Sequence, residues 1–320
     1  MKRILIFKTD RIGDLVNISP VFDNLLKNFP NSEIFLVCSK YNSSVAKYYT
    51  FLSKILIFDT NFIFFLLKNF KYFFFKKFDI ILQLDGKNHS YLSSIFINSK
   101  NKSCIKFIKV KNYFGKKINV SRPGAFISSF FNIVENCIED YTIKNNKNYH
   151  YLTLYLKLLE NLEINIYANE HFLPYTPKTS TNFPNPYFHF HIDERWCFFD
   201  EKIYYNLEKK IDSLSKNNII FVTSNFNGNN FYNDLYEKFK NHRNIYFKND
   251  ATVDDLIDII YKSHTVISSH AGFIVHVAAA FKKKIIDIVP DNIFDELERW
   301  IPFGVKYSRY SLNNFLNAKF

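Results

Sequence analysis

Glycine, proline and long apolar runs are scarce in this chain. Its 320 residues include 7 glycines and 9 prolines, which leaves little material for disordered linkers and indicates a globular chain throughout. No stretch approaches the ~18 to 20 apolar residues that span a bilayer, and the apolar run before Lys8 is too short for a signal-peptide core. We therefore expect a cytoplasmic protein that is neither exported nor transmembrane.

Cysteine is equally sparse, with four residues far apart in the chain and no C-x-x-C pair. This spacing is typical neither of a disulfide framework nor of a zinc site, and it fits a reducing cytosol. The phosphate-binding patterns G-x-x-x-x-G-K-[ST] and G-x-G-x-x-G are also missing, which argues against a kinase or a dehydrogenase. We expect no metal and no cofactor.

Acidic residues are outnumbered by basic ones. Lys and Arg number 42 against 30 Asp and Glu, which gives a formal net charge of +12. The excess favours an anionic partner, such as nucleotide phosphates, a phosphorylated glycan, an anionic membrane surface or nucleic acid. Alternatively, coding composition inflates Lys, Asn, Ile and Phe together, so charge alone does not decide between partners.

Short apolar runs that alternate with helical patterns predict an α/β fold. Arg3–Phe7 is typical of a buried parallel strand, a helical pattern runs from Leu15 to Phe29, and Glu33–Cys38 completes a right-handed βαβ unit. Further strands are predicted at Ile55–Phe58, Asp79–Leu84, Tyr187–Ile192, Ile219–Thr223, Ile245–Phe247, Thr265–Ser268 and Ile285–Val289, and helices at Tyr151–Leu162, Lys202–Leu214, Asn230–Phe239 and Thr252–Tyr261. The order indicates doubly wound, mostly parallel sheets.

A chain of 320 residues exceeds the size at which one core stays efficient, so two domains are expected. The segment Leu173–Pro186 carries four prolines among Ser, Thr and Asn, which is the strongest linker signal in the sequence. We place the boundary there, which gives two Rossmann-like domains, residues 1–175 and 176–320, facing a central cleft.

Ligands bind at the carboxyl ends of strands in open α/β sheets, so the loops after the strands are the candidate sites. The first of these loops, directly after the first strand, carries the charged residues Lys8, Asp10, Arg11 and Asp14 and one glycine. Asp14 suits a general base that accepts the proton of an attacking hydroxyl. The alternative is an acid that merely stabilises the first turn of a helix.

The second loop follows the strand that ends at Leu84. Asp85, Lys87 and His89 gather there around a glycine turn, as in a pocket that binds sugar hydroxyls or an acidic acceptor. A plain helix cap by a neighbouring polar residue is the alternative interpretation.

The third loop runs from Ser269 to His276. Its small residues and Gly272 let the backbone approach a ligand, and the following helix directs its N-terminal amides at phosphate oxygens. His270 and His276 flank the glycine and favour a functional site, although His276 alone would also suit helix packing. By contrast, the histidine pair at positions 189 and 191 lacks further metal ligands and predicts a core or cleft pair.

The stretch Asn61–Phe78 packs aromatic residues and lysines densely. One interpretation is an ordinary helix packed on the sheet with its lysines outward. The other is a basic aromatic face that makes peripheral contact with an anionic membrane surface, at the inner face of the cytoplasmic membrane.

These motifs together resemble glycosyltransferase family 9, the group that contains the lipopolysaccharide heptosyltransferases. The opening ILIFKTDRIGDLVNISPVF is similar to the family's strand, Gly-Asp pair, apolar helix and Thr/Ser-Pro. Asp79–Ser90 resembles its acceptor-side strand and loop, and Ala251–Ala280 resembles its donor-side helix, strand and histidine helix. The resemblance covers essentially the whole chain. It implies a GT-B fold and metal-independent, inverting transfer of a heptose or related sugar to a lipopolysaccharide or other envelope glycan.

The resemblance also implies roles for the residues. Asp14 becomes the general base, the first domain binds a lipid-linked or oligosaccharide acceptor, and the second holds a nucleotide-diphosphate sugar. The expected acceptor-binding residues are Lys8, Asp10, Arg11, Asp85, Lys87 and His89, and the expected donor-binding residues are Arg195, Thr223, Ser224, Ser269, His270, Gly272 and His276. We expect no nucleic-acid partner.

The donor loop departs from the family pattern. Family members usually carry an acidic residue and then Thr or Ser before the loop glycine, where this chain has His270 and Ala271. The altered loop favours, as an alternative, a catalytically degenerate protein that binds a nucleotide sugar or a glycan. An epimerase or hydrolase would need a redox-cofactor loop or a different acid/base pair, and the sequence shows neither.

Overall fold

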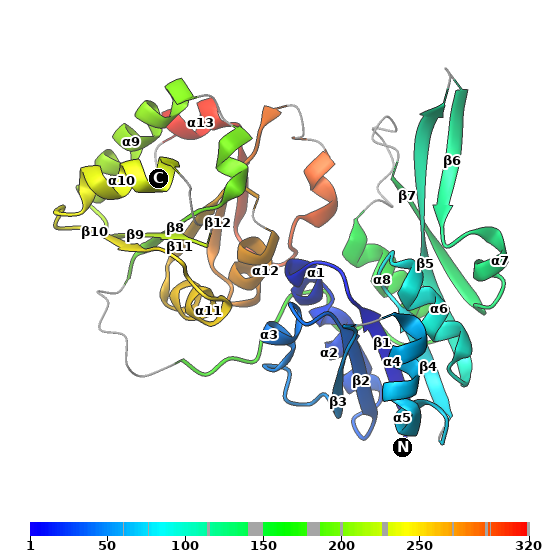
Figure 1. Cartoon of the computed structure of the whole chain (residues 1–320). Coiled ribbons are helices and arrows are strands. Elements are labelled where there is room, and N and C mark those ends of the chain that lie inside the picture. Colours follow the sequence, from blue (N-terminus) through cyan, green and yellow to red (C-terminus); the bar gives the residue numbers. More distant parts are fainter. Residues whose placement is uncertain are drawn as a thin grey trace. The chain divides into compact units, whose positions relative to one another are not determined.

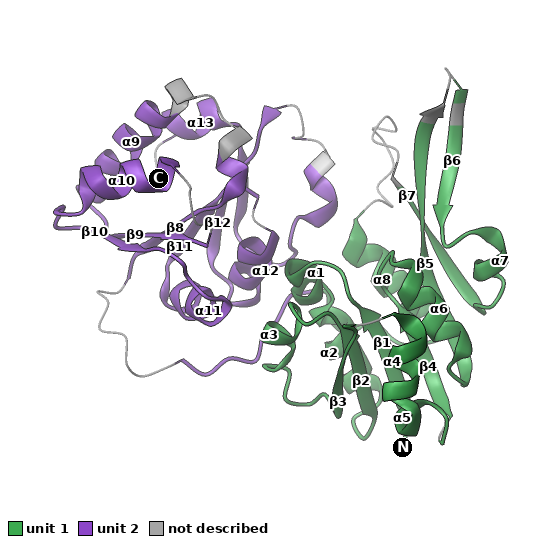
Figure 2. Cartoon of the chain, in the orientation of Figure 1, with its two compact units in different colours: residues 1–169 green, residues 170–320 purple. Residues whose placement is uncertain are grey.

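The computed structural model describes the chain except for residues 60, 76, 114–115, 140–149, 178–185, 199–200, 226–229, 271, 292–293, 295 and 319–320. Two compact units divide between Asn169 and Glu170 (Figure 2), close to the boundary predicted after residue 175. Part of the predicted linker, residues 178–185, and Ala271 of the predicted donor loop lie outside the described residues.

Unit 1, residues 1–169, alternates strands and helices in its first hundred residues (Figure 1). Its elements are β1 (Arg3–Lys8), α1 (Ile12–Asn17), α2 (Ser19–Asn28), β2 (Glu33–Cys38), α3 (Ser43–Ala46), β3 (Lys54–Ile57), α4 (Phe62–Lys68), α5 (Phe70–Phe73), β4 (Phe78–Gln83), α6 (Asn88–Phe96), β5 (Ser99–Tyr113), β6 (Lys116–Arg122), α7 (Ala125–Ser128), β7 (Ile133–Glu139) and α8 (Tyr151–Glu160).

The strands of unit 1 form a seven-stranded sheet in the order β3-β2-β1-β4-β5-β6, with β7 also paired to β5. All pairs are parallel except β5 with β6, which is antiparallel. Phe65, Leu66 and Phe73 of α4 and α5 pack on Leu5 and Phe7 of β1, so these two short helices cover one face of the sheet.

The helix predicted from Leu15 to Phe29 is two helices in the structure. It breaks at Ile18, and Pro20 occupies the first turn of α2. A proline there supplies no backbone N–H and its ring excludes a carbonyl one turn earlier, so a continuous helix would lose a hydrogen bond and gain a clash.

Strands β5 to β7 were not predicted. The sequence SKNKSCIKFIKVKNY of β5 alternates lysines with other side chains, so it lacks the continuous apolar run that marks a buried strand. The first part of β5 pairs with β4 and its later part pairs with both β6 and β7. Pairing between strands, rather than burial on two faces, therefore stabilises much of β5 to β7.

Unit 2, residues 170–320, repeats the α/β pattern. Its elements are β8 (Phe188–Ile192), a 3-10 helix (Glu194–Phe198), α9 (Glu201–Ser215), β9 (Ile220–Ser224), α10 (Asn230–Phe239), β10 (Ile245–Lys248), α11 (Val253–Lys262), β11 (Thr265–Ser268), α12 (Gly272–Ala280), β12 (Lys284–Ile288), a second 3-10 helix (Glu296–Trp300), β13 (Tyr307–Tyr310) and α13 (Leu312–Asn317).

The six strands of unit 2 are all parallel, in the order β10-β9-β8-β11-β12-β13. Leu207 and Ile211 of α9 and Phe315 of α13 pack in one core with Phe190 of β8. Ile259 of α11 belongs to a separate core. The prediction of an α/β fold with two mostly parallel sheets is confirmed.

Candidate functional site

The first two predicted loops leave the same edge of the unit 1 sheet. Strands β1 and β4 are parallel neighbours, with Phe7 opposite Gln83, and the Leu84 backbone N–H donates to the Phe7 carbonyl at 3.1 Å. Because parallel neighbours end side by side, the loop after Lys8 and the loop after Leu84 meet there.

The Asp85 carboxylate joins the two loops. Its Oδ2 atom accepts hydrogen bonds from the Thr9 backbone N–H (2.7 Å), the Thr9 hydroxyl (2.8 Å) and the Ser90 hydroxyl (3.1 Å). Its Oδ1 atom accepts from Gln83 Nε2 (2.9 Å) and from the Lys87 backbone N–H (3.0 Å). Asp85 is fully buried, and protein donors occupy both of its oxygens. This carboxylate therefore fixes the position of the loops, while its predicted contact with an acceptor stays a prediction.

Lys8 lies beneath the first loop with its charge buried. Its ammonium donates to Asp10 Oδ2 (2.9 Å), to the Tyr155 hydroxyl (2.9 Å) and to the Leu84 carbonyl (3.2 Å). Burial alone would lower the pKa of Lys8, but the negative charges of Asp10 and Asp14 and the contact with Tyr155 raise it well above its usual value. Lys8 is thus a permanent cation under this loop.

Asp10 lies near the Lys8 cation and two other carboxylates. Burial, together with the charges of Asp14 and Asp85, raises the pKa of Asp10 to about 7, although the attraction of Lys8 acts in the opposite direction. Its Oδ1 atom is buried and has no hydrogen-bond partner among the described residues. Asp10 therefore holds a proton for part of the time at neutral pH.

Asp14 differs from the other carboxylates of this loop. It lies half-buried in the first turn of α1, and over the described chain its carboxylate makes no hydrogen bond. A carboxylate without a hydrogen bond, in the helix that follows the first loop, is available to accept a proton from a bound hydroxyl, which is the role predicted for it.

The remaining predicted residues of unit 1 border the same loops. The Arg11 and Lys87 side chains are exposed. The half-buried His89 ring stacks on Phe58 with centroids 4.4 Å apart, and its Nε2 atom lies 3.3 Å from the Thr9 hydroxyl. Burial lowers the pKa of His89, so the ring is neutral at pH 7.

The predicted donor residues of unit 2 lie after neighbouring strands. Arg195 follows β8 and donates to Asp193 Oδ2 at 3.0 Å, while burial raises the pKa of Asp193 to about 6. Ser224 ends β9 and is buried. The Thr223 hydroxyl lies 2.7 Å from His189 Nε2 and 2.9 Å from His191 Nδ1, so two core histidines already engage it.

Burial lowers the pKa of His189 well below its usual value and that of His191 to about 3. Both rings are therefore neutral at pH 7. Across the described residues no group of three or more His, Cys, Asp or Glu side chains is arranged to hold a metal ion.

The third loop connects β11 to α12. Ser269 is buried, and the ring and backbone of the partly buried His270 both bind Asp287 of β12. Gly272 begins α12, and a Cβ atom built there would meet no atom within 4 Å, so there is open space beside this glycine. His276 is buried and stacks on His171, with ring centroids 5.1 Å apart.

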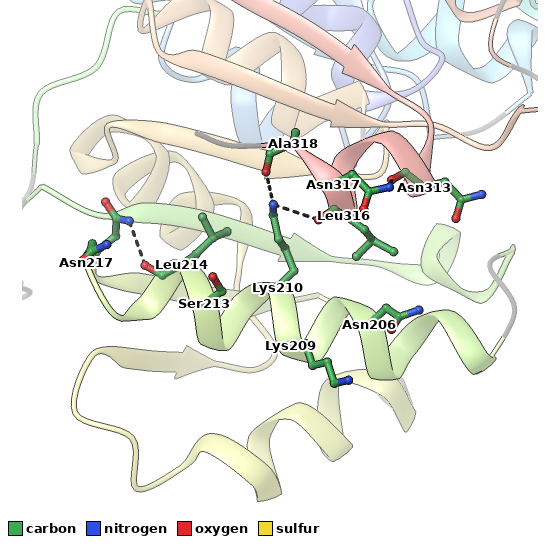
Figure 3. A pocket seen from close by; sticks show the side chains of 11 residues that line it. Asn206, Lys209, Lys210, Ser213, Leu214, Asn217, Asn313, Leu316, Asn317 and Ala318 are labelled. Carbon is green, nitrogen blue, oxygen red and sulfur yellow. Dashed lines mark hydrogen bonds between the residues drawn. The ribbon is translucent and has the colours of Figure 1, made fainter.

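A pocket of about 640 Å³ in unit 2 lies elsewhere, between α9 and α13 (Figure 3). Asparagines and two lysines line it, and Lys210 donates to the backbone carbonyls of Leu316 and Ala318 (Figure 3). None of the predicted site residues lines this pocket.

Sequence reasoning missed the residues that hold these loops in place, namely Thr9, Gln83, Tyr155, Asp287 and Tyr307. Gln83 and Asp287 carried a usable signal, because each is a polar residue within an otherwise apolar strand run. Tyr155 and Tyr307 carried none, because their partners lie on other strands and helices.

Unit 1 also exposes an unusual number of apolar side chains around α4, α5 and α6. We call this set the aromatic ridge, and it consists of Ile63, Phe64, Leu67, Phe70, Phe74, Phe75 and Phe96. The most exposed ring, Phe75, has 74% of its surface accessible. Exposed lysines lie among these residues at positions 68, 71 and 77. In the described chain, no helix is both long enough and apolar enough to cross a bilayer.

Comparison with known proteins rests on structure, because no family model and no curated protein sequence matches this chain. The crystal structure of a family 9 glycosyl transferase from Veillonella parvula superimposes with a TM-score of 0.71 at 12% identity, covering 97% of this chain and 86% of that one. The chain has the GT-B fold of family 9 glycosyltransferases.

Two E. coli enzymes share this GT-B fold. Heptosyltransferase WaaC with ADP-2-deoxy-2-fluoro heptose matches with a TM-score of 0.66 at 14% identity, covering 98% of this chain and 95% of that one. ADP-heptose lipopolysaccharide heptosyltransferase II matches with a TM-score of 0.64 at 12% identity, covering 97% and 90%. A putative UDP-N-acetylglucosamine 2-epimerase from Listeria monocytogenes shares the fold at 0.54. The predicted resemblance to family 9 is confirmed in structure.

Proposed function

We propose that this chain is a metal-independent, inverting glycosyltransferase of the family 9 type. It transfers a heptose or a related sugar from a nucleotide-diphosphate sugar to a lipopolysaccharide or other envelope glycan. The observation that carries the proposal is the unpaired Asp14 carboxylate at the carboxyl end of the unit 1 sheet, above the buried Lys8 cation and beside loops fixed by Asp85. The GT-B fold shared with heptosyltransferases crystallised with ADP and an ADP-heptose analogue supports the nucleotide-sugar donor.

In the proposed reaction, Asp14 accepts the proton of the acceptor hydroxyl as its oxygen attacks the anomeric carbon. The bond from that carbon to the diphosphate breaks on the opposite side, so the configuration inverts. Lys87 and His89 border the first two loops and contact the acceptor, and the loop from Ser269 to Gly272 receives the diphosphate at the amino end of α12.

Replacement of Asp14 by Asn tests the general base. We expect turnover to fall by roughly 10²- to 10⁴-fold, the scale of general base catalysis, while nucleotide affinity and thermal stability stay unchanged. Transfer and donor hydrolysis would be followed with ADP-, GDP- and UDP-sugars. Asp23→Asn, at an acid of α2 that pairs with Lys27 one helical turn away, is the matched control and should retain full turnover.

Wild-type turnover in Asp14→Asn would remove this carboxylate from the mechanism. Nucleotide-sugar binding by the wild-type chain without any turnover would instead support the degenerate binding protein.

We further propose that the aromatic ridge rests on an anionic membrane surface at the inner face of the cytoplasmic membrane, where a lipid-linked acceptor is anchored. Aromatic rings lie at the depth of lipid headgroups, and nearby lysines are attracted to anionic lipid by about 1 kcal/mol each. The Phe70 and Phe74 rings stack with centroids 4.6 Å apart. Without a membrane contact, exposed rings of this kind would remain in water, which is unfavourable in free energy.

Co-sedimentation with phosphatidylcholine vesicles, with and without phosphatidylglycerol, tests the membrane contact. The variant Phe64→Ser, Leu67→Ser, Phe75→Ser should lose most of its binding to anionic vesicles without unfolding, because these side chains are exposed. Phe73 is left unchanged because it is buried in the core. Phe126→Ser, at a ring 78% exposed on α7, is the control. Equal sedimentation of all three proteins would refute the contact.

A further inference from the structure

His270 is held at two points by one carboxylate. Its backbone N–H donates to Asp287 Oδ1 and its ring Nδ1 atom lies against Asp287 Oδ2, both at 2.6 Å. The Tyr307 hydroxyl also donates to Asp287 Oδ2 at 2.6 Å. Asp287 itself is fully buried near the carboxyl end of β12.

This arrangement fixes which ring nitrogen of His270 carries a hydrogen. A carboxylate only accepts hydrogen bonds, so Nδ1 must be the donor toward Asp287. Burial and the neighbouring Asp287 charge raise the pKa of Tyr307, so the phenol keeps its hydrogen and continues to donate. The other ring nitrogen, Nε2, makes no hydrogen bond to any described residue, and the side chain is 13% exposed.

The backbone at His270 supports a role in binding. Its φ angle is +44°, in the left-handed region that costs a residue with a side chain about 1 to 2 kcal/mol. Such conformations cluster where a side chain must be presented to a ligand. The neighbouring Ser269 hydroxyl is buried and makes no hydrogen bond within the described chain, and a Cβ atom at Gly272 would meet no atom within 4 Å.

We propose that His270 is the cation that binds the diphosphate of the donor, with Asp287 and Tyr307 as the residues that position it. The inference rests on the proposed transferase function and names the group that receives the leaving charge. As the bond from the anomeric carbon to oxygen breaks, its electron pair stays on the diphosphate, and the Nε2–H of the imidazolium donates to that oxygen. The acceptor's proton goes to Asp14.

The electrostatics favour an anion at this place. The amino end of α12 carries a partial positive charge, and a protonated His270 adds a full one beside it. Among the described residues, the charged or titratable groups nearby include Tyr307, Arg309 on the same strand as Tyr307, and Arg299 beside Trp300, whose ring meets His270 with centroids 6.4 Å apart. Both arginines add positive charge.

Nucleotide affinities measured by calorimetry test the proposal. Wild type, His270→Asn and the control His264→Asn, at the opposite end of β11, would be titrated with adenosine and ADP, guanosine and GDP, and uridine and UDP. Asn tolerates the left-handed backbone and keeps the backbone N–H toward Asp287. We expect His270→Asn to lose roughly 10- to 100-fold in nucleoside diphosphate affinity, the worth of a charged hydrogen bond, with nucleoside affinity unchanged.

A further variant separates binding from a merely structural role. Asp287→Asn should lose nucleoside diphosphate affinity while nucleoside affinity stays unchanged. Should Asp287→Asn fail to fold, Tyr307→Phe keeps the carboxylate and should show the same changes more weakly.

Unchanged diphosphate affinity in His270→Asn, or an equal loss of nucleoside and diphosphate affinity, would overturn the assignment of His270 and leave the transferase proposal standing. If the wild-type chain binds none of the three diphosphates, both this assignment and the nucleotide-sugar donor are wrong.

Discussion

The Asp85 carboxylate offers the sharpest test of how the unit 1 site is built. Replacement by Asn keeps the shape but leaves one acceptor atom where there were two. If the amide oxygen takes the place of Oδ2 and keeps the Thr9 and Ser90 donors, the amide NH₂ faces the Lys87 backbone N–H and Gln83. Gln83 can turn its buried, unpaired Oε1 toward the new donor, but the backbone N–H cannot adapt.

The cost follows from these groups. A buried donor left without an acceptor costs about 1 to 3 kcal/mol. Replacing a charged acceptor by a neutral one also weakens each remaining hydrogen bond, which adds roughly 1 to 2 kcal/mol. The substitution also removes the repulsion between Asp85 and Asp10. This gain offsets only part of the cost, because Asp10 is already partly protonated. We expect Asp85→Asn to lower the free energy of unfolding by about 2 to 5 kcal/mol.

Urea denaturation followed by circular dichroism measures this difference. Asp23→Asn serves as the control, because an exposed pair with Lys27 one helical turn away contributes about 0.3 to 0.5 kcal/mol. A free energy of unfolding for Asp85→Asn within about 1 kcal/mol of wild type would refute the view that this carboxylate organises the two loops.

Two further predictions concern single residues. The pKa of Asp10 is raised from 3.8 to about 7, so the native chain holds a proton that the unfolded chain has released, and stability should fall as the pH rises from 4 to 7. Asp10→Asn should flatten that fall in melting temperatures taken between pH 4 and pH 8, and an unchanged slope would contradict the assignment. Gly304→Ala should cost more than about 1 kcal/mol, because its φ of +71° disfavours a side chain and a Cβ atom there would collide with the Glu170 side chain, whereas Gly124→Ala, at φ −65° with open space around it, should change stability by less than about 0.5 kcal/mol in thermal unfolding. Equal effects would contradict the strain at Gly304.

Most strands could be predicted because their signal is local. The predicted strand Thr265–Ser268 has the same bounds as β11, since a buried parallel strand needs only a short apolar run bounded by polar residues. The β5 strand could not be placed, because its lysines alternate and its stability comes from pairing with partners that the sequence does not name. The periodicity from Leu15 to Phe29 correctly predicts helical structure, but the prediction of one continuous helix overlooks the break that Pro20 causes.

The candidate site divides in the same way. The convergence of the loops after β1 and β4 was predictable, because parallel order alone brings strand ends together. The contacts that fix each loop were not, because they join residues distant in the chain, such as Lys8 with Tyr155 and His270 with Asp287. A sequence shows which side chains are available but not which of them meet across a sheet.

The anchorage of both loops to Asp85 has a consequence for protein engineering. A chimera that imports a segment after β4 without Asp85 would leave the Thr9 backbone N–H and hydroxyl without their carboxylate, and one that imports a segment after β1 without Thr9 would leave that carboxylate without a hydroxyl donor. The two segments should therefore be exchanged as a matched set.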